Sequence, residues 1–527
     1  MTAGTFVKGS AAEIQAKEGI VMTYSPNLAS AFNETRMRSD KITPCSGMCS
    51  LCSADCVGTC EIGLSAVLGK SVVYPTNTGN NQVAGEKDYP IDYSHFNING
   101  RAFGAVGCPA DSEQATIYGV GLATSIGRRH PVKLTMPIIL PAVIKLNWPD
   151  YFAAAAMAGV CCVIGESSPG KDENLQLDAN GKIARFAKLK EMKAAFSRYD
   201  RGYGQIVLQC NLEDLAMGLA EYAITECGFT AIEFKFGQSA KGTQPAVRIG
   251  TLEEALAKKQ KGMIVQPDPE DPEIVKLCER QSCPEFWSYS RLPMWTEESL
   301  RQRIESLRAL GLKNVYFKMA GFDRRDLEEV LRLAAVLEVD LVTFDGAGGG
   351  SGYSPNKMMN EWGLPAVCIE SVLPEICGRL ERAGLVLPDI AITGGISSED
   401  QVFKALAIGA PYVKLVGLCR AAMAAAMVGE KVGQLLASGA VPKHLERFGA
   451  SREALFRHLP ELRSIFGEEA DKMSAGAIGC YSYLQKIAFG LRHFAALNRK
   501  FDVKYINRED VIPMTRDAKD ILTGIWY

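Results

Sequence analysis

The stretch DIAITGGISSEDQVFKALAIGAPYVKLVGL, residues 389–418, decides the fold. Two short apolar runs, 389–394 and 412–417, have the length of buried parallel strands, and they flank a segment of helical spacing at 398–408. The same alternation reaches back to residue 131 and predicts eight strands, each followed by a helix. A (β/α)8 TIM barrel closes at that number, and a doubly wound open sheet is the structural alternative.

The predicted strands are 134–143, 160–165, 205–210, 231–237, 315–321, 340–345, 389–394 and 412–417, and the predicted helices are 149–158, 185–198, 214–227, 296–310, 325–337, 365–383, 398–408 and 418–438. The connection 238–295 is unusually long, which predicts a functional loop or a small structure of its own. The expected organisation is an arm with a cysteine-rich segment (1–64), a wrapping segment (65–130), the barrel (131–440) and a helical C-terminal extension (441–527).

The composition is that of an ordinary globular protein. Of 527 residues, 47% are hydrophobic and 22% are charged, and 58 Lys and Arg nearly balance 60 Asp and Glu. A net charge of −2 provides no basic field for nucleic acid or for an anionic membrane surface. The N-terminus lacks a signal-peptide pattern and no apolar run is long enough to span a bilayer. A cytoplasmic chain that forms a homo-oligomer is therefore expected.

Five cysteines are concentrated in a short segment with the spacing C-x3-C-x2-C-x3-C-x3-C, namely Cys45, Cys49, Cys52, Cys56 and Cys60. Thiolates this close can share one metal site, and four are sufficient. The lack of histidine in the segment favours an iron–sulfur cluster, of the 4Fe–4S type, over zinc. The other cysteines are too dilute for a disulfide scaffold. The first three also match the radical-SAM spacing, but they lie about 80 residues before the first strand, where that motif does not occur.

Glycine-rich turns follow three of the predicted strands. Gly394 and Gly395 end the seventh strand, and Val416, Gly417 and Leu418 end the eighth. Free N–H groups where a helix begins bind phosphate, and the turns after strands seven and eight are the usual phosphate site of such barrels. After the sixth strand, Asp345 and Gly346 open a run that includes Gly349 and Gly350, where the backbone can approach a ligand closely. Simple tight turns and a flexible loop are the alternatives.

Two lysines interrupt apolar strands. Lys318 lies in the predicted fifth strand, where a charge is expected to be paired or catalytic, and it could hold negative charge on a reduced flavin; a side chain that extends outward between helices is the alternative. Lys235 shares a strand face with Glu233, and Gln238 and Lys241 follow that strand. Two cations and an amide suit a substrate carboxylate, whereas a Glu233–Lys235 pair is the alternative.

In combination, these motifs resemble the FMN-binding domain of the glutamate synthase family over about residues 131–440. The resemblance rests on Gly165-Glu166, on KFGQSAK at 235–241, on Phe317-Lys318, on GGSGYSP at 349–355 and on TGG with VFKALAIGA within 393–410. It implies FMN over the barrel mouth, with the phosphate at Gly394, Gly395 and Gly417 and the pyrimidine side at Lys318. The rest of the implied cofactor site is lined by Pro141, Ala142, Gly165, Asp345, Gly346, Gly349, Gly350, Val416 and Leu418.

The resemblance also implies that Glu166, Gln238 and Lys241 bind a 2-oxo acid, beside Lys235. This sequence departs from the family in having Ala347-Gly348 where the family has His-Asp, in having only Cys419 after strand eight, and in showing no amidotransferase domain before the barrel. We therefore expect an FMN and iron–sulfur oxidoreductase that reduces a 2-oxo or 2-imino acid by flavin hydride transfer, with ferredoxin or a reductase subunit as electron donor. A subunit like N-methylglutamate synthase, which forms a C–N bond, and a non-catalytic electron relay are the alternatives.

Overall fold

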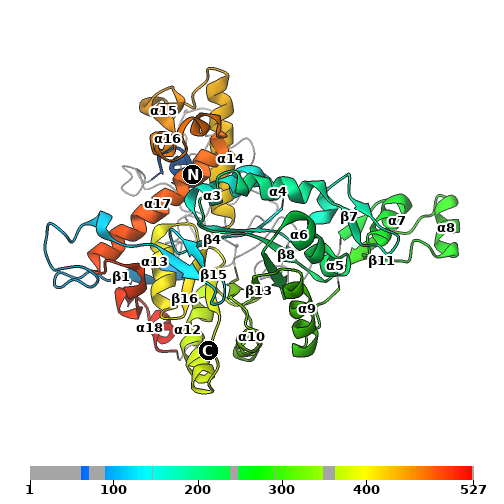
Figure 1. Cartoon of the computed structure of the whole chain (residues 1–527), viewed down its shortest axis with the longest axis horizontal. Coiled ribbons are helices and arrows are strands. Elements are labelled where there is room, and N and C mark those ends of the chain that lie inside the picture. The colour runs from blue at the N-terminus through cyan, green and yellow to red at the C-terminus, as the bar shows by residue number, and fades with distance from the viewer. Residues whose placement is uncertain are drawn as a thin grey trace, which may run out of the picture.

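The computed structural model describes residues 61–69, 89–144, 146–237, 247–289, 291–347 and 362–524. Its centre is a closed barrel of eight parallel strands that neighbour one another in chain order (Figure 1). They are β4 (Ile138–Val143), β5 (Cys161–Ile164), β8 (Ile206–Cys210), β9 (Ala231–Lys235), β13 (Asn314–Ala320), β14 (Leu341–Asp345), β15 (Asp389–Thr393) and β16 (Val413–Gly417). Each coincides with a predicted strand, so the TIM barrel is confirmed and the open sheet was the wrong alternative.

The helices that cover the barrel also follow the prediction. They are α3 (Trp148–Ala158), α4 (Ala187–Ser197), α5 (Leu212–Ala216), α6 (Leu219–Cys227), α9 (Glu297–Ala309), α10 (Arg324–Val336), α12 (Ala366–Arg382), α13 (Glu399–Ile408) and α14 (Arg420–Ala437). The predicted helix 214–227 was wrong in one respect, because it is divided in two. Gly218 has φ +72°, which takes the backbone out of the helix between α5 and α6.

The hydrophobic core has two layers. Apolar side chains such as Ile139, Val207 and Leu341 fill the barrel interior, and Ile126 and Leu134 from the hairpin β2 (Thr124–Ile126) and β3 (Val132–Leu134) join this cluster. A larger layer lies between the strands and the helices. The expected burial of Cys161 and Cys162 is confirmed, and burial raises the pKa of the Cys161 thiol to about 12.

The long connection after β9 contains a small structure of its own. It consists of β10 (Val247–Ile249), α7 (Leu252–Gln260), β11 (Ile264–Gln266), α8 (Pro272–Glu279) and β12 (Phe286–Tyr289), with the antiparallel sheet order β10-β12-β11. Ile249, Ala255, Val265 and Phe286 form its separate core. Cys278 and Cys283 form a local disulfide that the sequence argument did not anticipate. Figure 1 shows α7 and α8 at one end of the molecule, away from the C-terminal helices.

The segments before and after the barrel lie together. β1 (Phe96–Ile98) pairs with β17 (Val511–Pro513), and α2 (Glu61–Leu68) packs against α14 and α17 (Ala475–Leu497). The remaining elements are β6 (Gln176–Leu177), β7 (Ile183–Arg185), α15 (Arg452–Leu455), α16 (Leu459–Phe466) and α18 (Arg516–Thr523). None of the described helices combines the length and the apolar character that a membrane span requires.

Candidate active site

The carboxyl ends of the barrel strands bring together three of the charged residues that the sequence predicted. Lys235 is the last residue of β9, Lys318 lies beside it in the register of β13, and Asp345 ends β14. Their exposed fractions are 3%, 4% and 3%, respectively. Charges buried to this degree need compensating partners close by.

Lys235 forms an ion pair with Glu166. Its Nζ lies 3.8 Å from Oε1 of Glu166, and both side chains are buried. Glu166 follows Gly165, whose N–H donates to the Val143 carbonyl at 2.9 Å and thereby joins this turn to β4. This ion pair connects the end of β9 with the turn that follows β5.

Glu233 is held by a different residue. Nε2 of Gln209, in β8, donates to Oε1 of Glu233 at 2.5 Å, and both side chains are about 1% exposed. Burial raises the pKa of Glu233, although the charge of Lys318 and the hydrogen bond from Gln209 oppose the rise. Glu233 therefore takes up a proton at a higher pH than an exposed glutamate does.

Lys318 remains a cation inside the barrel. Burial acts to lower the pKa of Lys318, but the negative charges of Asp345 and Glu233 outweigh burial, and the pKa is raised. With 4% of the residue exposed, the predicted alternative of an outward-pointing lysine does not agree with the structure. The charges of Asp345 and Glu233 therefore favour the protonated, positively charged form of Lys318 at the barrel mouth.

The glycine turns after β15 and β16 are closely packed. Gly394 and Gly395 have φ values of +115° and +76°. A Cβ added to Gly394 would lie 2.5 Å from the carbonyl oxygen of Gly346, and one added to Gly417 would lie 2.6 Å from the Cβ of Thr393. Only glycine allows this approach of three strand ends. The predicted Gly346, Gly394 and Gly417 are therefore neighbours at the barrel mouth.

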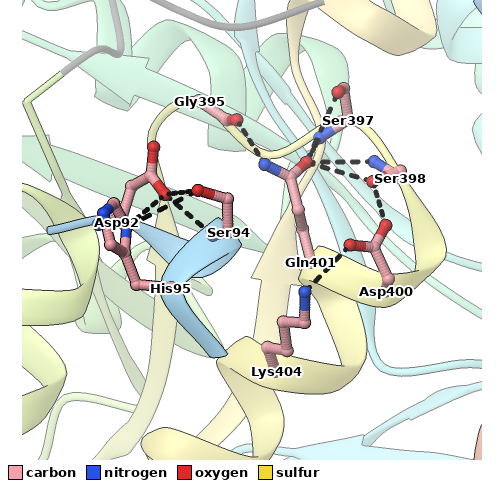
Figure 2. Close-up of polar contacts among 9 residues, drawn as sticks. All are labelled: Asp92, Ser94, His95, Gly395, Ser397, Ser398, Asp400, Gln401 and Lys404. Atoms are coloured by element: carbon pink, nitrogen blue, oxygen red, sulfur yellow. Dashed lines mark hydrogen bonds and ion pairs between the residues drawn. The ribbon is translucent and has the colours of Figure 1, made fainter. Parts of the chain in front are cut away.

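Gln401 organises the loop between Gly395 and α13. Its Oε1 accepts hydrogen bonds from the N–H groups of Ser397 and Ser398 at 2.8 and 3.3 Å, and its Nε2 donates to the carbonyl of Gly395 at 3.3 Å (Figure 2). Within the described part of the chain, the N–H groups of Gly394 and Gly395 donate to no backbone carbonyl. These amides are among those that the turn can offer to an anion.

Two acidic residues open α13, and an anion site beside them needs their charge to be neutralised. Lys404 Nζ lies 3.2 Å from Oδ2 of Asp400, as Figure 2 shows, and Lys486 from α17 forms a buried ion pair with Glu399. Burial acts to raise the pKa of Asp400, but the charge of Lys404 and the hydrogen bond from Ser398 together have a larger effect in the opposite direction. The pKa is therefore lowered, and this carboxylate stays ionised and paired. Because each acid has a lysine, the first turn of α13 does not repel a phosphate as two free carboxylates would.

Pro141 and Ala142 form the edge of this region on β4. The Pro141 carbonyl accepts a hydrogen bond from the buried Tyr151 hydroxyl at 3.0 Å. The Cγ atom of Pro141 would lie 2.9 Å from a Cβ added to Gly417. Val416 and Leu418 are buried beside the same turn, and their N–H groups donate to the carbonyls of Pro137 and Ile139. The predicted residues of β4 and β16 are therefore in contact.

Several predicted site residues lie outside the described residues. They are Gln238, Lys241, Gly349, Gly350 and the cysteines Cys45, Cys49, Cys52, Cys56 and Cys60. Within the described ranges, no group of three or more His, Cys, Asp or Glu side chains is arranged to hold a metal ion. The substrate loop, the glycine run and the cysteine segment stay predictions.

Sequence reasoning missed Asp214. Its Oδ2 accepts the N–H groups of Ser167 and Asn211 at 2.9 and 3.1 Å, and Ser167 has φ +61°, so this carboxyl group fixes the turn that carries Glu166. Burial raises the pKa of Asp214 to about 7, against the effect of those two N–H groups. Asp214 and Ser167 are 47 positions apart, and no local pattern reveals such a contact.

Arg420 was also missed, although the sequence contained a signal. It is the first residue of α14 and is half-buried, three positions after Gly417. A basic side chain at the start of a helix that follows a glycine turn can add charge to an anion site.

Part of the chain matches known protein sequences. Residues 279–429 match the model described as the conserved region in glutamate synthase. An archaeal-type glutamate synthase [NADPH] from Dehalococcoides mccartyi is 36% identical over 77 residues, which cover 14% of this chain and 15% of that relative. The matched part of this chain therefore spans about one seventh of the relative's length.

Two of the solved structures that align with this chain do so at low identity. The recombinant flavin-binding domain of flavocytochrome b2 from baker's yeast shares 12% identity with a TM-score of 0.44, and the alignment covers 80% of this chain and 77% of that chain. A soluble variant of the membrane-associated (S)-mandelate dehydrogenase from Pseudomonas putida shares 13% identity with a TM-score of 0.43, covering 80% and 88%. The part of the chain from residue 279 to residue 429, which contains β13 to β16, is therefore similar in sequence to the conserved region in glutamate synthase.

Proposed function

We propose that the chain is an FMN-dependent oxidoreductase of the glutamate synthase type that contains an iron–sulfur cluster and reduces a 2-oxo acid or its 2-imino form. One observation carries the proposal: the buried cation Lys318 lies at the same barrel mouth as the glycine turns after β15 and β16. The family match supports it, because residues 279–429 include β13 to β16 and both turns.

The residues present fit FMN. Its phosphate is anionic. Hydrogen-bond donors for it are available from the amides of Gly394 and Gly395 and from the turn at Gly417. Positive charge is available from the guanidinium of Arg420, at the start of α14. When bound, FMN supplies hydride transfer. Lys318 places a positive charge where the pyrimidine side of the ring accumulates negative charge on reduction. Asp345 and Glu233 hold this lysine in its charged form.

The proposed substrate site lies at the ends of β5 and β9. Glu166 and Lys235 form a buried pair there, and Gln238 and Lys241 follow directly after β9 in the sequence. In the proposal, Lys241 and Gln238 bind the substrate carboxylate, and the Lys235–Glu166 pair orients the carbon that is reduced. Glu233, with its raised pKa, can hold a proton in the same mouth.

The proposed cluster rests on the spacing of the five cysteines. The chain adds one supporting contact: α2 begins at Glu61, directly after Cys60, and packs against α14, the helix that opens at the cofactor turn. Ferredoxin or a reductase subunit is the proposed donor, and a homo-oligomer is the proposed assembly.

Anaerobic purification followed by visible absorption spectroscopy tests the proposal. The expected result is a flavin spectrum overlaid by broad iron–sulfur absorption, with FMN identified after extraction and with iron and sulfide in the protein. Turnover is then measured with a set of 2-oxo acids, a chemically reduced dye and either ammonia or methylamine. A protein that binds no flavin even after incubation with FMN refutes the proposal, and strict dependence on methylamine indicates the N-methylglutamate synthase type instead.

Substitution of Lys241 tests the substrate site separately. Lys241→Met keeps the apolar stem, removes the charge and is expected to weaken apparent substrate binding roughly 10- to 150-fold, because a charged hydrogen bond contributes about 1.5–3 kcal/mol. FMN content is expected to stay at the wild-type level. Lys261→Met, on the same insertion and exposed, is the matched control. Unchanged substrate affinity together with altered proteolysis of the insertion would show that Lys241 only anchors this loop.

A further inference from the structure

The long helix α17 of the C-terminal extension packs directly against α13, the helix that begins at the proposed phosphate turn. Gly490 of α17 lies so close to Glu399 that an added Cβ would be 2.2 Å from Cγ of that side chain. Further along, the rings of Phe403 and Phe494 lie 5.9 Å apart. The close approach at Gly490 allows side chains of α17 to reach the residues that precede α13.

Two polar side chains of α17 reach this loop. The hydroxyl of Tyr483 donates to the carbonyl of Ser397 at 2.7 Å, and Nζ of Lys486 forms an ion pair with the carboxylate of Glu399. Tyr483 and Lys486 are each 1% exposed, so water does not compete for these contacts. Ser397 is two residues beyond Gly395, and Glu399 is the first residue of α13.

We infer that Tyr483 and Lys486 are positioning residues for the cofactor phosphate, an inference that rests on the proposed FMN site. Tyr483 fixes the carbonyl of Ser397 and so sets the direction of the peptide groups that follow Gly395. Lys486 neutralises Glu399 in the first turn of α13, next to the proposed phosphate site. Without that cation, the first turn of α13 would contain a carboxylate that has lost its buried ion pair, two residues after Ser397 of the proposed phosphate turn. Neither side chain needs to touch FMN for this effect.

Binding of two flavins to the cofactor-free protein tests the inference. FMN and riboflavin share the ring and differ in the phosphate, so the ratio of their dissociation constants isolates the contribution of the phosphate site. Quenching of flavin fluorescence on titration with apo-protein gives both constants. The variants are Tyr483→Phe and Lys486→Met. Their matched controls are Tyr481→Phe, on the same helix but bonded to Glu461, and Lys500→Met, from the buried Lys500–Asp510 pair beyond α17.

The expected result is a selective loss of FMN affinity. Tyr483→Phe is expected to weaken FMN binding about 5- to 10-fold, the size of one net hydrogen bond, and Lys486→Met roughly 10- to 100-fold, because Glu399 loses its buried ion pair but keeps its negative charge. Riboflavin affinity is expected to stay within about twofold, and the controls are expected to change neither constant. The double variant Lys486→Met with Glu399→Gln removes both charges and is expected to recover most of the FMN affinity.

The outcomes separate this inference from the proposed function. If wild-type apo-protein binds neither flavin, the cofactor assignment fails, and this inference fails with it. If wild type prefers FMN but Tyr483→Phe and Lys486→Met keep the wild-type FMN-to-riboflavin ratio, α17 only packs against the barrel. A lowered unfolding midpoint with that unchanged ratio leads to the same conclusion, because a purely structural role changes stability and not phosphate preference.

Discussion

Replacement of Lys318 by methionine is the most direct test of the charge balance in the barrel mouth. Lys318 is 4% exposed and lies among the carboxyl groups of Asp345, Glu233 and Glu166. Methionine retains a similar unbranched stem, so little packing is lost. The substitution therefore removes one buried charge and leaves its acidic partners in place.

The magnitude follows from this burial. Lys318 acts on these carboxylates through its charge, and we take the cost of its removal from buried ion pairs, in which the loss of one partner leaves the other charge without compensation and costs about 3–5 kcal/mol. We therefore expect the free energy of unfolding of the cofactor-free protein to fall by about that amount at pH 8. The loss is expected to shrink toward pH 5. Without Lys318, the pKa of Glu233 rises further, and at low pH that carboxyl group is protonated and needs no cation.

Urea unfolding followed by circular dichroism at pH 5 and pH 8 measures both effects. Lys276→Met is the control, since its ion pair with Glu273 is exposed, and exposed pairs contribute about 0–1 kcal/mol. Adding Glu233→Gln to Lys318→Met is expected to restore part of the stability. A Lys318→Met variant that is no less stable at pH 8 than the Lys276→Met control would refute the reasoning.

Three further predictions address the cofactors and the pH dependence. Gly395→Asp is expected to abolish FMN binding in dialysis assays without unfolding the barrel. Gly395→Ala has the same strain at φ +76° but adds no charge, so it is expected to retain more FMN binding. Cys52→Ala is expected to lose iron and acid-labile sulfide in metal analysis while FMN stays bound; zinc or no metal in the anaerobic wild type would contradict the cluster. The pKa of Asp214 is about 7 in the folded protein, against a usual 3.8. The free energy of unfolding is therefore expected to fall by about 4 kcal/mol as the pH rises from 4 through 7. Asp214→Asn is expected to flatten this decline in urea unfolding.

The barrel could be predicted from sequence because its pattern is local. Each strand is a short apolar run, and each helix has its own periodicity, so every element is visible within about 15 residues. Gly218 is the instructive exception. One glycine inside an apolar helical pattern is compatible with an uninterrupted helix, and only its positive φ shows that α5 and α6 are separate.

The candidate site was predictable where residue type alone indicates chemistry. A lysine within an apolar strand indicates a buried charge, and the structure brings Lys235 and Lys318 to the same mouth. The partners of these charges were less accessible. Gln209 holds Glu233 from a neighbouring strand, and Asp214 holds the turn of Glu166 from a position 47 residues away from Ser167. Such contacts depend on strand register and barrel closure, which a one-dimensional pattern does not contain.

The acids of α13 show how this limit affects a functional interpretation. A phosphate site followed by Glu399 and Asp400 is electrostatically inconsistent when the sequence is considered alone. Lys404 resolves half of the conflict, and its position four residues after Asp400 is a recognisable helical pair. Lys486 resolves the other half from 87 residues away, in a helix that the sequence assigned to a separate extension. The C-terminal extension therefore completes the charge balance of the proposed cofactor site, so its removal is expected to impair FMN binding even if the barrel still folds.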